Sequence, residues 1–210
     1  MIITKNSTTP EALKETFAIT QSMFRVAAIQ MASGPNVAAN LQEAGRLIEL
    51  AARYDKIHLF GFEMGQECYS EERTIEPGNR VVTVESPYGR IGVSVCYDLR
   101  FPELYRAMGE VDLILVPSAF TETTGKAHWD TLIRARAIEN LAYVIAPAQG
   151  GYHVNGRETH GHTMIVDPWG VVLDRLPRGS GVVVAGVNPT YQAKIRRSLP
   201  ALTHKTVRSW

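Results

Sequence analysis

The sequence has few cysteines, no long apolar run and almost no net charge. Only Cys68 and Cys96 occur among its 210 residues, which excludes a disulfide-stabilised secreted scaffold. No apolar run reaches the length that a membrane-spanning helix needs. The 22 Lys and Arg balance 21 Asp and Glu, so that the formal net charge of +1 gives no sign of a polyanion-binding surface. We therefore expect a cytoplasmic protein with free thiols that binds neither nucleic acid nor membrane.

The amino-terminal residues have a different composition from the rest. Residues 1–22 carry charges and lack the apolar core of a signal peptide. The whole chain is 45% hydrophobic and 20% charged, values typical of a globular protein. We expect a polar extension over residues 1–22 and a single domain over residues 23–210.

Strand and helix patterns alternate early in the chain, and hairpin-like strands follow later. Strands are predicted at 24–30, 57–60, 81–85, 91–95, 113–116, 143–148, 163–166, 171–176 and 181–187. Helices are predicted at 38–53, 102–109 and 126–140. This order favours an α/β protein in which helices are layered on a mixed sheet.

One junction departs from ordinary chain architecture. The helix pattern that ends at Arg53 is followed immediately by the strand pattern that begins at Tyr54. Neither a Gly or Asn stop nor any loop residue separates the two patterns. The junction therefore favours the absence of an internal segment between residues 53 and 54.

Cys96 lies in the most informative stretch, between a predicted strand and a predicted helix. After it, Asp98 is suited to cap a helix whose first turn would contain Pro102 and Glu103. Backbone N–H groups and the helix dipole at such a turn favour the thiolate and would stabilise an oxyanion. The alternative is a small buried residue at a strand end, but the surrounding pattern favours a nucleophile.

Several segments carry a resemblance to a known family. They are residues 54–60, 89–106, 116–121, 125–129, 134–140 and 161–170, with residues 24–31 similar to an opening strand. Together they resemble the nitrilase, or carbon–nitrogen hydrolase, superfamily, and within it the Nit branch of omega-amidase-like and deaminated-glutathione-amidase-like enzymes. The resemblance implies an α-β-β-α sandwich that forms homodimers, here without part of its sheet.

The resemblance also implies the site residues. It makes Cys96 the nucleophile and Lys56 the catalytic lysine, which would favour the thiolate and stabilise the oxyanion together with the N–H of Tyr97. Glu71 aligns with the glutamate that orients the lysine, although a shift of one position would select Glu72. The expected substrate-binding residues are Phe120, Thr121, His128 and Trp129. No metal and no organic cofactor is implied.

The general-base glutamate of the family has no counterpart in the sequence. Glu49 and Glu63 stand in the wrong context for that role. Loss of a general base typically costs about 10²- to 10⁴-fold in rate. We therefore expect an impaired amidase that acts on small linear carboxamides through a cysteine thioester, or else a non-catalytic family member that serves as a binding or assembly partner or is a defective deletion product.

Two other chemistries remain open from the residues alone. His160 and His162, with Asp167 and His153, could share a metal as in a metal hydrolase. Cys96 could instead pair with His128, as in a papain-like protease.

Overall fold

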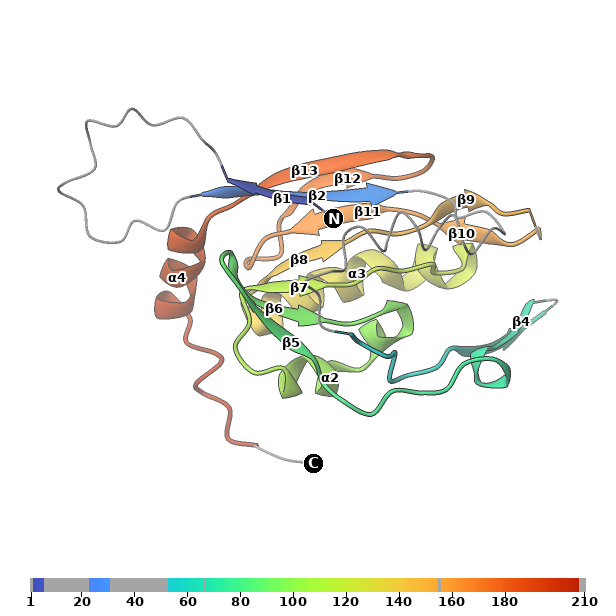
Figure 1. The fold of residues 1–210 in the computed structure, drawn as a ribbon, viewed down its shortest axis with the longest axis horizontal. Coiled ribbons are helices and arrows are strands. Elements are labelled where there is room, and N and C mark those ends of the chain that lie inside the picture. The colour runs from blue at the N-terminus through green and yellow to red at the C-terminus, as the bar shows by residue number, and fades with distance from the viewer. Residues whose placement is uncertain (1, 6–22, 31–52, 66, 155, 208–210) are drawn as a thin grey trace.

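The computed structural model describes residues 2–5, 23–30, 53–65, 67–154 and 156–207 (Figure 1). Its strands are β1 (Ile2–Lys5), β2 (Phe24–Gln30), β3 (Gly61–Met64), β4 (Glu67–Ser70), β5 (Thr83–Ser86), β6 (Gly89–Val93), β7 (Leu113–Leu115), β8 (Tyr143–Ala146), β9 (Gly150–Tyr152), β10 (Glu158–His160), β11 (Thr163–Val166), β12 (Val172–Leu176) and β13 (Gly181–Val187). Its helices are α2 (Pro102–Ala107), α3 (Glu122–Asn140) and α4 (Pro189–Ser198), with 3-10 helices at Glu71–Arg73 and Cys96–Arg100.

Two sheets form the centre of the molecule. The larger sheet has six strands in the order β12-β11-β8-β7-β6-β5, and the smaller has three in the order β1-β2-β13. Strands β6, β7 and β8 run parallel, while their outer neighbours are antiparallel. The hairpins β3–β4 and β9–β10 project at one end of the molecule (Figure 1).

The central strands bury both of their faces, so each contributes to two hydrophobic cores. In β8, Val144 and Ala146 pack in a core beneath α2 and α3, whereas Tyr143 and Ile145 pack in a core against β2 and β13. Because side chains alternate along a strand, a strand covered on both faces is apolar throughout. The helix–sheet–sheet order follows, with α2 and α3 on one face of the larger sheet and β2 and β13 on the other. This arrangement confirms the predicted α/β fold class.

Helix α3 has a recognisable cap at each end. The Thr121 side chain accepts a hydrogen bond from the Thr124 N–H at 3.2 Å, which caps the first turn. Leu141 follows the last turn with φ of 47°, the left-handed conformation that commonly ends a helix. The helix is therefore longer at its start than the predicted 126–140.

Other elements also differ from the sequence-based expectation. Residues 57–60 form no strand, because the Phe60 N–H donates to the Glu71 side chain rather than to a neighbouring strand. Residues 2–5, expected within a loose extension, pair with β2, with Ile2 opposite Ala27. The predicted helix over residues 38–53 lies outside the described residues except for Arg53, which like Tyr54 across the junction belongs to no helix or strand.

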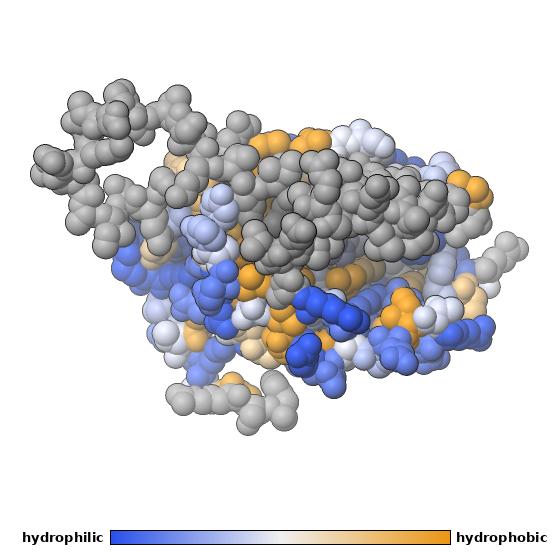
Figure 2. Space-filling model, viewed as in Figure 1, coloured by the Kyte–Doolittle hydropathy of each residue, from blue (hydrophilic) through white to orange (hydrophobic). Residues whose placement is uncertain are grey.

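The outer face of the smaller sheet carries exposed apolar side chains. Val182 and Val184 on β13 are 56% and 38% exposed. Figure 2 shows apolar surface at the upper edge, where β13 lies in Figure 1.

Within the part of the chain that the structure describes, no helix is long and apolar enough to cross a membrane.

Candidate active site

Cys96 stands at a sharp turn directly after strand β6. Its backbone has φ of 51°, in the left-handed region that a residue with a side chain rarely adopts. The turn is fixed on both sides, since the Cys96 N–H donates to the Pro117 carbonyl at 3.0 Å and the Val95 N–H donates to Asp98 Oδ2 at 2.9 Å. A strained turn that the surrounding structure holds in place is typical of functional sites.

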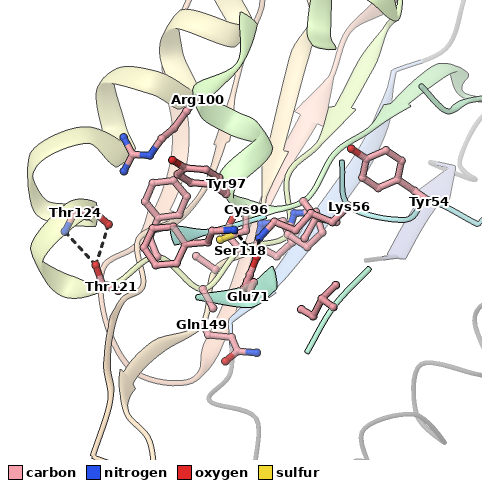
Figure 3. A pocket seen from close by; sticks show the side chains of 18 of the residues that line it. Tyr54, Lys56, Glu71, Cys96, Tyr97, Arg100, Ser118, Thr121, Thr124 and Gln149 are labelled. Atoms are coloured by element: carbon pink, nitrogen blue, oxygen red, sulfur yellow. Dashed lines mark hydrogen bonds and ion pairs between the residues drawn. The ribbon is translucent and has the colours of Figure 1, made fainter. Parts of the chain in front are cut away.

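The Cys96 side chain faces a cavity of about 620 Å³ (Figure 3). The described residues that line it come from residues 54–76, from the Cys96 turn, from the segment after β7 and from the β9–β10 hairpin. They are Tyr54, Asp55, Lys56, Phe60, Glu71, Ile75, Glu76, Val95, Cys96, Tyr97, Arg100, Pro117, Ser118, Ala119, Phe120, Thr121, Thr124, Pro147, Ala148, Gln149 and Arg157.

Lys56 and Glu71 form an ion pair beside the nucleophile. Lys56 Nζ donates to Glu71 Oε2, the same oxygen that accepts from the Phe60 N–H at 2.7 Å. The Lys56 side chain is only 9% exposed, and Figure 3 shows the pair directed toward Cys96. Glu72 is exposed and its carboxylate contacts the Ser70 hydroxyl instead. Of the two candidates, the structure therefore brings Glu71 to the lysine.

The backbone of the lysine segment is held by a close approach of Gly78. The Gly78 N–H donates to the Lys56 carbonyl at 2.8 Å. A Cβ at this position would lie 2.0 Å from the Asp55 carbonyl oxygen. Only glycine allows the two backbones to come this close.

The environment of the Cys96 thiol differs from the expectation that it favours the thiolate. Burial raises the pKa of the Cys96 thiol, and this effect is larger than any other acting on it. A backbone hydrogen bond from Ala119 and the charge of Lys56 lower the pKa, while Glu71 raises it. A backbone hydrogen bond and Lys56 thus act on the thiol pKa in the predicted direction, but desolvation, which the prediction did not consider, outweighs them.

Tyr97 contributes its ring to the wall of the cavity. The ring packs edge-to-face against Phe60 with centroids 5.2 Å apart. The backbone group that acts on the sulfur is that of Ala119, in the segment after β7, which sequence reasoning did not identify. An oxyanion contact from the Tyr97 N–H stays a prediction.

The four expected substrate-binding residues divide into two pairs. Phe120 and Thr121 line the cavity, whereas His128 and Trp129 are not among its described lining residues. Trp129 is fully buried behind Phe120, with ring centroids 5.0 Å apart, and its indole N–H donates to the His162 carbonyl at 2.8 Å. His128 points outward from α3 toward Arg100. The helical rotation between adjacent residues explains why one is in the core and the other on the surface.

This placement of His128 also bears on the papain-like alternative. The described contact of its imidazole Nδ1 is with Arg100 Nη1, at 3.2 Å, and the residue is exposed. A general base must come within hydrogen-bond reach of the proton that it accepts. The structure therefore gives no Cys96–His128 pair.

Two arginines in the wall were missed by sequence reasoning. Arg100 lies over the rings of Tyr97 and Phe120, at 5.7 and 5.3 Å from their centroids. Arg157 donates to the Ala119 carbonyl at 2.5 Å, and its charge lowers the pKa of the Cys96 thiol. Arg100 stands in a segment that resembles the family, but no local pattern indicated that the β9–β10 hairpin would bring Arg157 to the same cavity.

The residues proposed as metal ligands have other partners. The rings of His160 and His162 stack with centroids 4.2 Å apart, and His160 Nδ1 lies 3.0 Å from Glu122 Oε2. Asp167 accepts the N–H groups of Trp169 and Val171 within a turn. His153 contacts the Thr159 hydroxyl. Across the described ranges, no group of three or more His, Cys, Asp or Glu side chains is arranged to hold a metal ion.

Three of the described carboxylates line the cavity, and two of them are already paired. Asp55, Glu71 and Glu76 line it, and of these Asp55 accepts a hydrogen bond from Arg53 while Glu71 is paired with Lys56. Glu63 is exposed on β3 and Glu49 lies outside the described residues.

Comparisons with known proteins agree with this geometry. The carbon–nitrogen hydrolase family matches residues 36–197. The deaminated glutathione amidase of Synechocystis is 46% identical over 159 residues, which cover 73% of this chain and 58% of the relative. The human deaminated glutathione amidase is 43% identical, covering 74% of this chain and 49% of its own length. The chain thus spans about half the length of the curated relatives that it matches.

A solved structure shows a similar arrangement. The NitFhit protein of C. elegans superposes with a TM-score of 0.68 at 42% identity, covering 74% of this chain and 39% of that one. An amidase variant from Nesterenkonia sp. AN1, described with covalent addition of an acetamide moiety at its active-site cysteine, gives a TM-score of 0.58 at 25% identity, covering 74% of this chain and 57% of that one.

Proposed function

The chain belongs to the carbon–nitrogen hydrolase family, in the Nit branch of the nitrilase superfamily, and from this premise we propose that it is an amidase that uses Cys96 as its nucleophile. The observation that carries the proposal is the Lys56–Glu71 ion pair directed at Cys96 within one cavity (Figure 3). The substrate class that we propose is a small linear carboxamide.

The reaction would proceed in two halves. The Cys96 sulfur attacks the amide carbon, and the Lys56 ammonium stabilises the oxyanion that forms. The C–N bond then breaks, the thiol proton is transferred to the leaving nitrogen, and ammonia departs from a thioester on Cys96. Water attacks the thioester, which releases the carboxylic acid and returns the proton to the sulfur.

The relatives support an amide as the substrate. Two of them are named deaminated glutathione amidase. The Nesterenkonia amidase carries a covalent adduct on its active-site cysteine. Arg100 and Arg157 place two guanidinium groups in the cavity wall, and these are suited to bind an anionic group of a substrate.

We expect turnover to be slow. The family's general-base glutamate has no counterpart in the sequence, and its loss typically costs about 10²- to 10⁴-fold in rate. A raised thiol pKa adds to this effect, since it lowers the fraction of thiolate at neutral pH. A cytoplasmic homodimer remains the expected state of the protein.

The same two features favour a second candidate. A family member without its general base, and with a largely protonated thiol, would serve as a binding or assembly partner rather than as a catalyst.

One experiment separates the candidates. The protein is incubated with a small omega-amide such as 2-oxoglutaramate, and intact-protein and peptide mass spectrometry are used to find an acyl adduct while ammonia release is measured. We expect an adduct on Cys96 that persists in Cys68→Ala, because Cys68 is exposed on β4 away from the cavity. If the folded protein forms no adduct and releases no ammonia, the amidase is ruled out and the non-catalytic candidate is supported.

A further inference from the structure

Asp98 is a fully buried carboxylate that accepts four hydrogen bonds. Its Oδ1 accepts from the backbone N–H of His58 at 3.0 Å and contacts His58 Nδ1 at 2.8 Å. Its Oδ2 accepts from the Tyr54 hydroxyl at 2.7 Å and from the Val95 N–H at 2.9 Å. The residue is 0% exposed. Asp98 does not cap α2, which Phe101 precedes, but its contact with the Val95 N–H caps the 3-10 helix Cys96–Arg100.

The donors to Asp98 lie on the two segments that carry Lys56 and Cys96. Tyr54 lies two residues before Lys56 and His58 two residues after it, while Val95 directly precedes Cys96. One carboxylate therefore binds the chain on both sides of the lysine and also fixes the turn of the nucleophile. Figure 3 shows the Lys56 side chain directed toward Cys96, with Tyr54 farther from the sulfur.

The stretch around Lys56 has little hydrophobic packing to hold it. Among the described residues from 53 to 90, none is classed as buried. Ile57 is the residue of this stretch that packs, partly buried, against the core beneath α2 and α3. Besides the ring contacts of His58 with Phe101 and of Phe60 with Tyr97, polar contacts therefore restrain this stretch. Hydrogen bonds to a buried charge are among the stronger ones, at about 1.5–3 kcal/mol each.

The donors are suited to a lasting contact. Burial, followed by the hydrogen bond to Asp98, raises the pKa of Tyr54, so that its phenol stays protonated and continues to donate. The His58 ring stacks on Phe101 with centroids 3.7 Å apart, which fixes its orientation toward Asp98.

We propose that Asp98 is a positioning residue that sets the Lys56 ammonium against the Cys96 sulfur. It touches neither substrate nor reacting atoms, and acts by fastening the backbone on both sides of Lys56 to the turn that presents the thiol. The consequence for turnover rests on the proposed amidase function, but the geometric claim does not.

Asp98→Asn is the direct test. The amide keeps one acceptor oxygen and places an NH₂ group against donors, so that about half of the four contacts are lost. The readout is the pH dependence of Cys96 alkylation by iodoacetamide, followed by peptide mass spectrometry with exposed Cys68 as an internal reference. Because the Lys56 charge lowers the pKa of the Cys96 thiol more than Glu71 raises it, displacement of the pair moves the profile to higher pH. We expect a shift of about one pH unit, which is about tenfold less thiolate at neutral pH.

Three further variants distinguish positioning from a general loss of structure. Asp167→Asn removes a buried carboxylate that also accepts two backbone N–H groups, but at a turn outside the cavity lining. It should lower stability and leave the Cys96 profile unchanged. Tyr54→Phe and His58→Phe each remove one side-chain contact and keep the ring, and should give smaller shifts in the same direction if Asp98→Asn fails to fold.

The action through Lys56 is tested in a second background. In Lys56→Met the alkylation profile should already be shifted, and adding Asp98→Asn should shift it no further. Additive shifts in the double variant would overturn the proposal. So would unchanged alkylation profiles in folded Asp98→Asn, in Tyr54→Phe and in His58→Phe. Alkylation needs no turnover, so the two claims are tested separately. If the protein shows these shifts but has no amidase activity, the proposed function is wrong and the proposed role of Asp98 stands.

Discussion

The nucleophile and its lysine are held in place by different kinds of interaction. Cys96 belongs to a region in which Leu99, Tyr105 and Ile114 are all 0% exposed and pack beneath the larger sheet. Lys56 belongs to a stretch without a single buried residue between 53 and 90, as far as the structure describes it. The first position is set mainly by hydrophobic packing. The second depends more on polar contacts with Asp98, Glu71 and the Gly78 backbone, beside the ring contacts of the neighbouring His58 and Phe60.

This difference means that stability and activity depend on separate residues. Replacing large buried side chains in the packed region with small ones should strongly destabilise the protein. Substitutions of the polar contacts around Lys56 should change the chemistry of Cys96 while most of the free energy of unfolding is retained.

Trp129→Ala should have the largest effect, on the packed side of the comparison. The ring is fully buried between Phe120 and the β10–β11 connection, and its removal leaves a cavity and an unpaired His162 carbonyl. Removing a buried tryptophan costs about 3–5 kcal/mol, which denaturant unfolding would measure. Trp129→Phe should cost less, and equal stabilities of all three proteins would contradict the placement of Trp129 in the core.

Lys56→Met should have the next largest effect, on the chemistry rather than on the fold. It removes the positive charge beside the sulfur and the group expected to stabilise the oxyanion. Loss of one such donor costs about 10²- to 10³-fold in rate, measured here as the rate of acyl-adduct formation on Cys96. The free energy of unfolding should fall by less than in Trp129→Ala, and an unchanged adduct rate would show that Lys56 does not act on Cys96.

Glu71→Gln should have a smaller effect, and Glu72→Gln serves as its matched control. Glu71 holds Lys56 through a charge-assisted hydrogen bond, which the neutral amide weakens. A contribution of about 1.5–3 kcal/mol corresponds to about 10- to 100-fold in rate. The adjacent Glu72 is exposed and contacts Ser70, so its substitution should leave the adduct rate unchanged. Equal effects of the two substitutions would contradict the assignment of Glu71.

The sequence predicted the packed region better than the polar one. The strands at 24–30, 163–166 and 181–187 were predicted with their exact limits, because runs of apolar residues leave a strong local signal whether both faces of the strand are buried, as at 163–166, or one, as at 181–187. The predicted strand at 57–60 was wrong, although three of its four residues are apolar. Its conformation depends on Glu71 and Asp98, which are distant in sequence, and no local pattern reports such contacts.

The site shows the same contrast. Cys96 was predicted from its local pattern, Lys56 and Glu71 from the resemblance, and the structure brings Lys56 and Glu71 together beside Cys96. The raised thiol pKa, the contact from Ala119 and the arrival of Arg157 all depend on burial or on chain segments that meet only in the folded protein.

Hydrogen exchange resolved to single amides tests the central comparison most directly. The account predicts that Asp98→Asn accelerates exchange at His58, Phe60 and Gly78, whose N–H groups bond to Asp98, Glu71 and the Lys56 backbone. Exchange at Val116 and Ser118, whose N–H groups bond to backbone carbonyls beside the packed core, should stay as slow as in the original protein. Parallel acceleration of both groups of amides would contradict the account, because it would show that the nucleophile and the lysine are held by one cooperative unit.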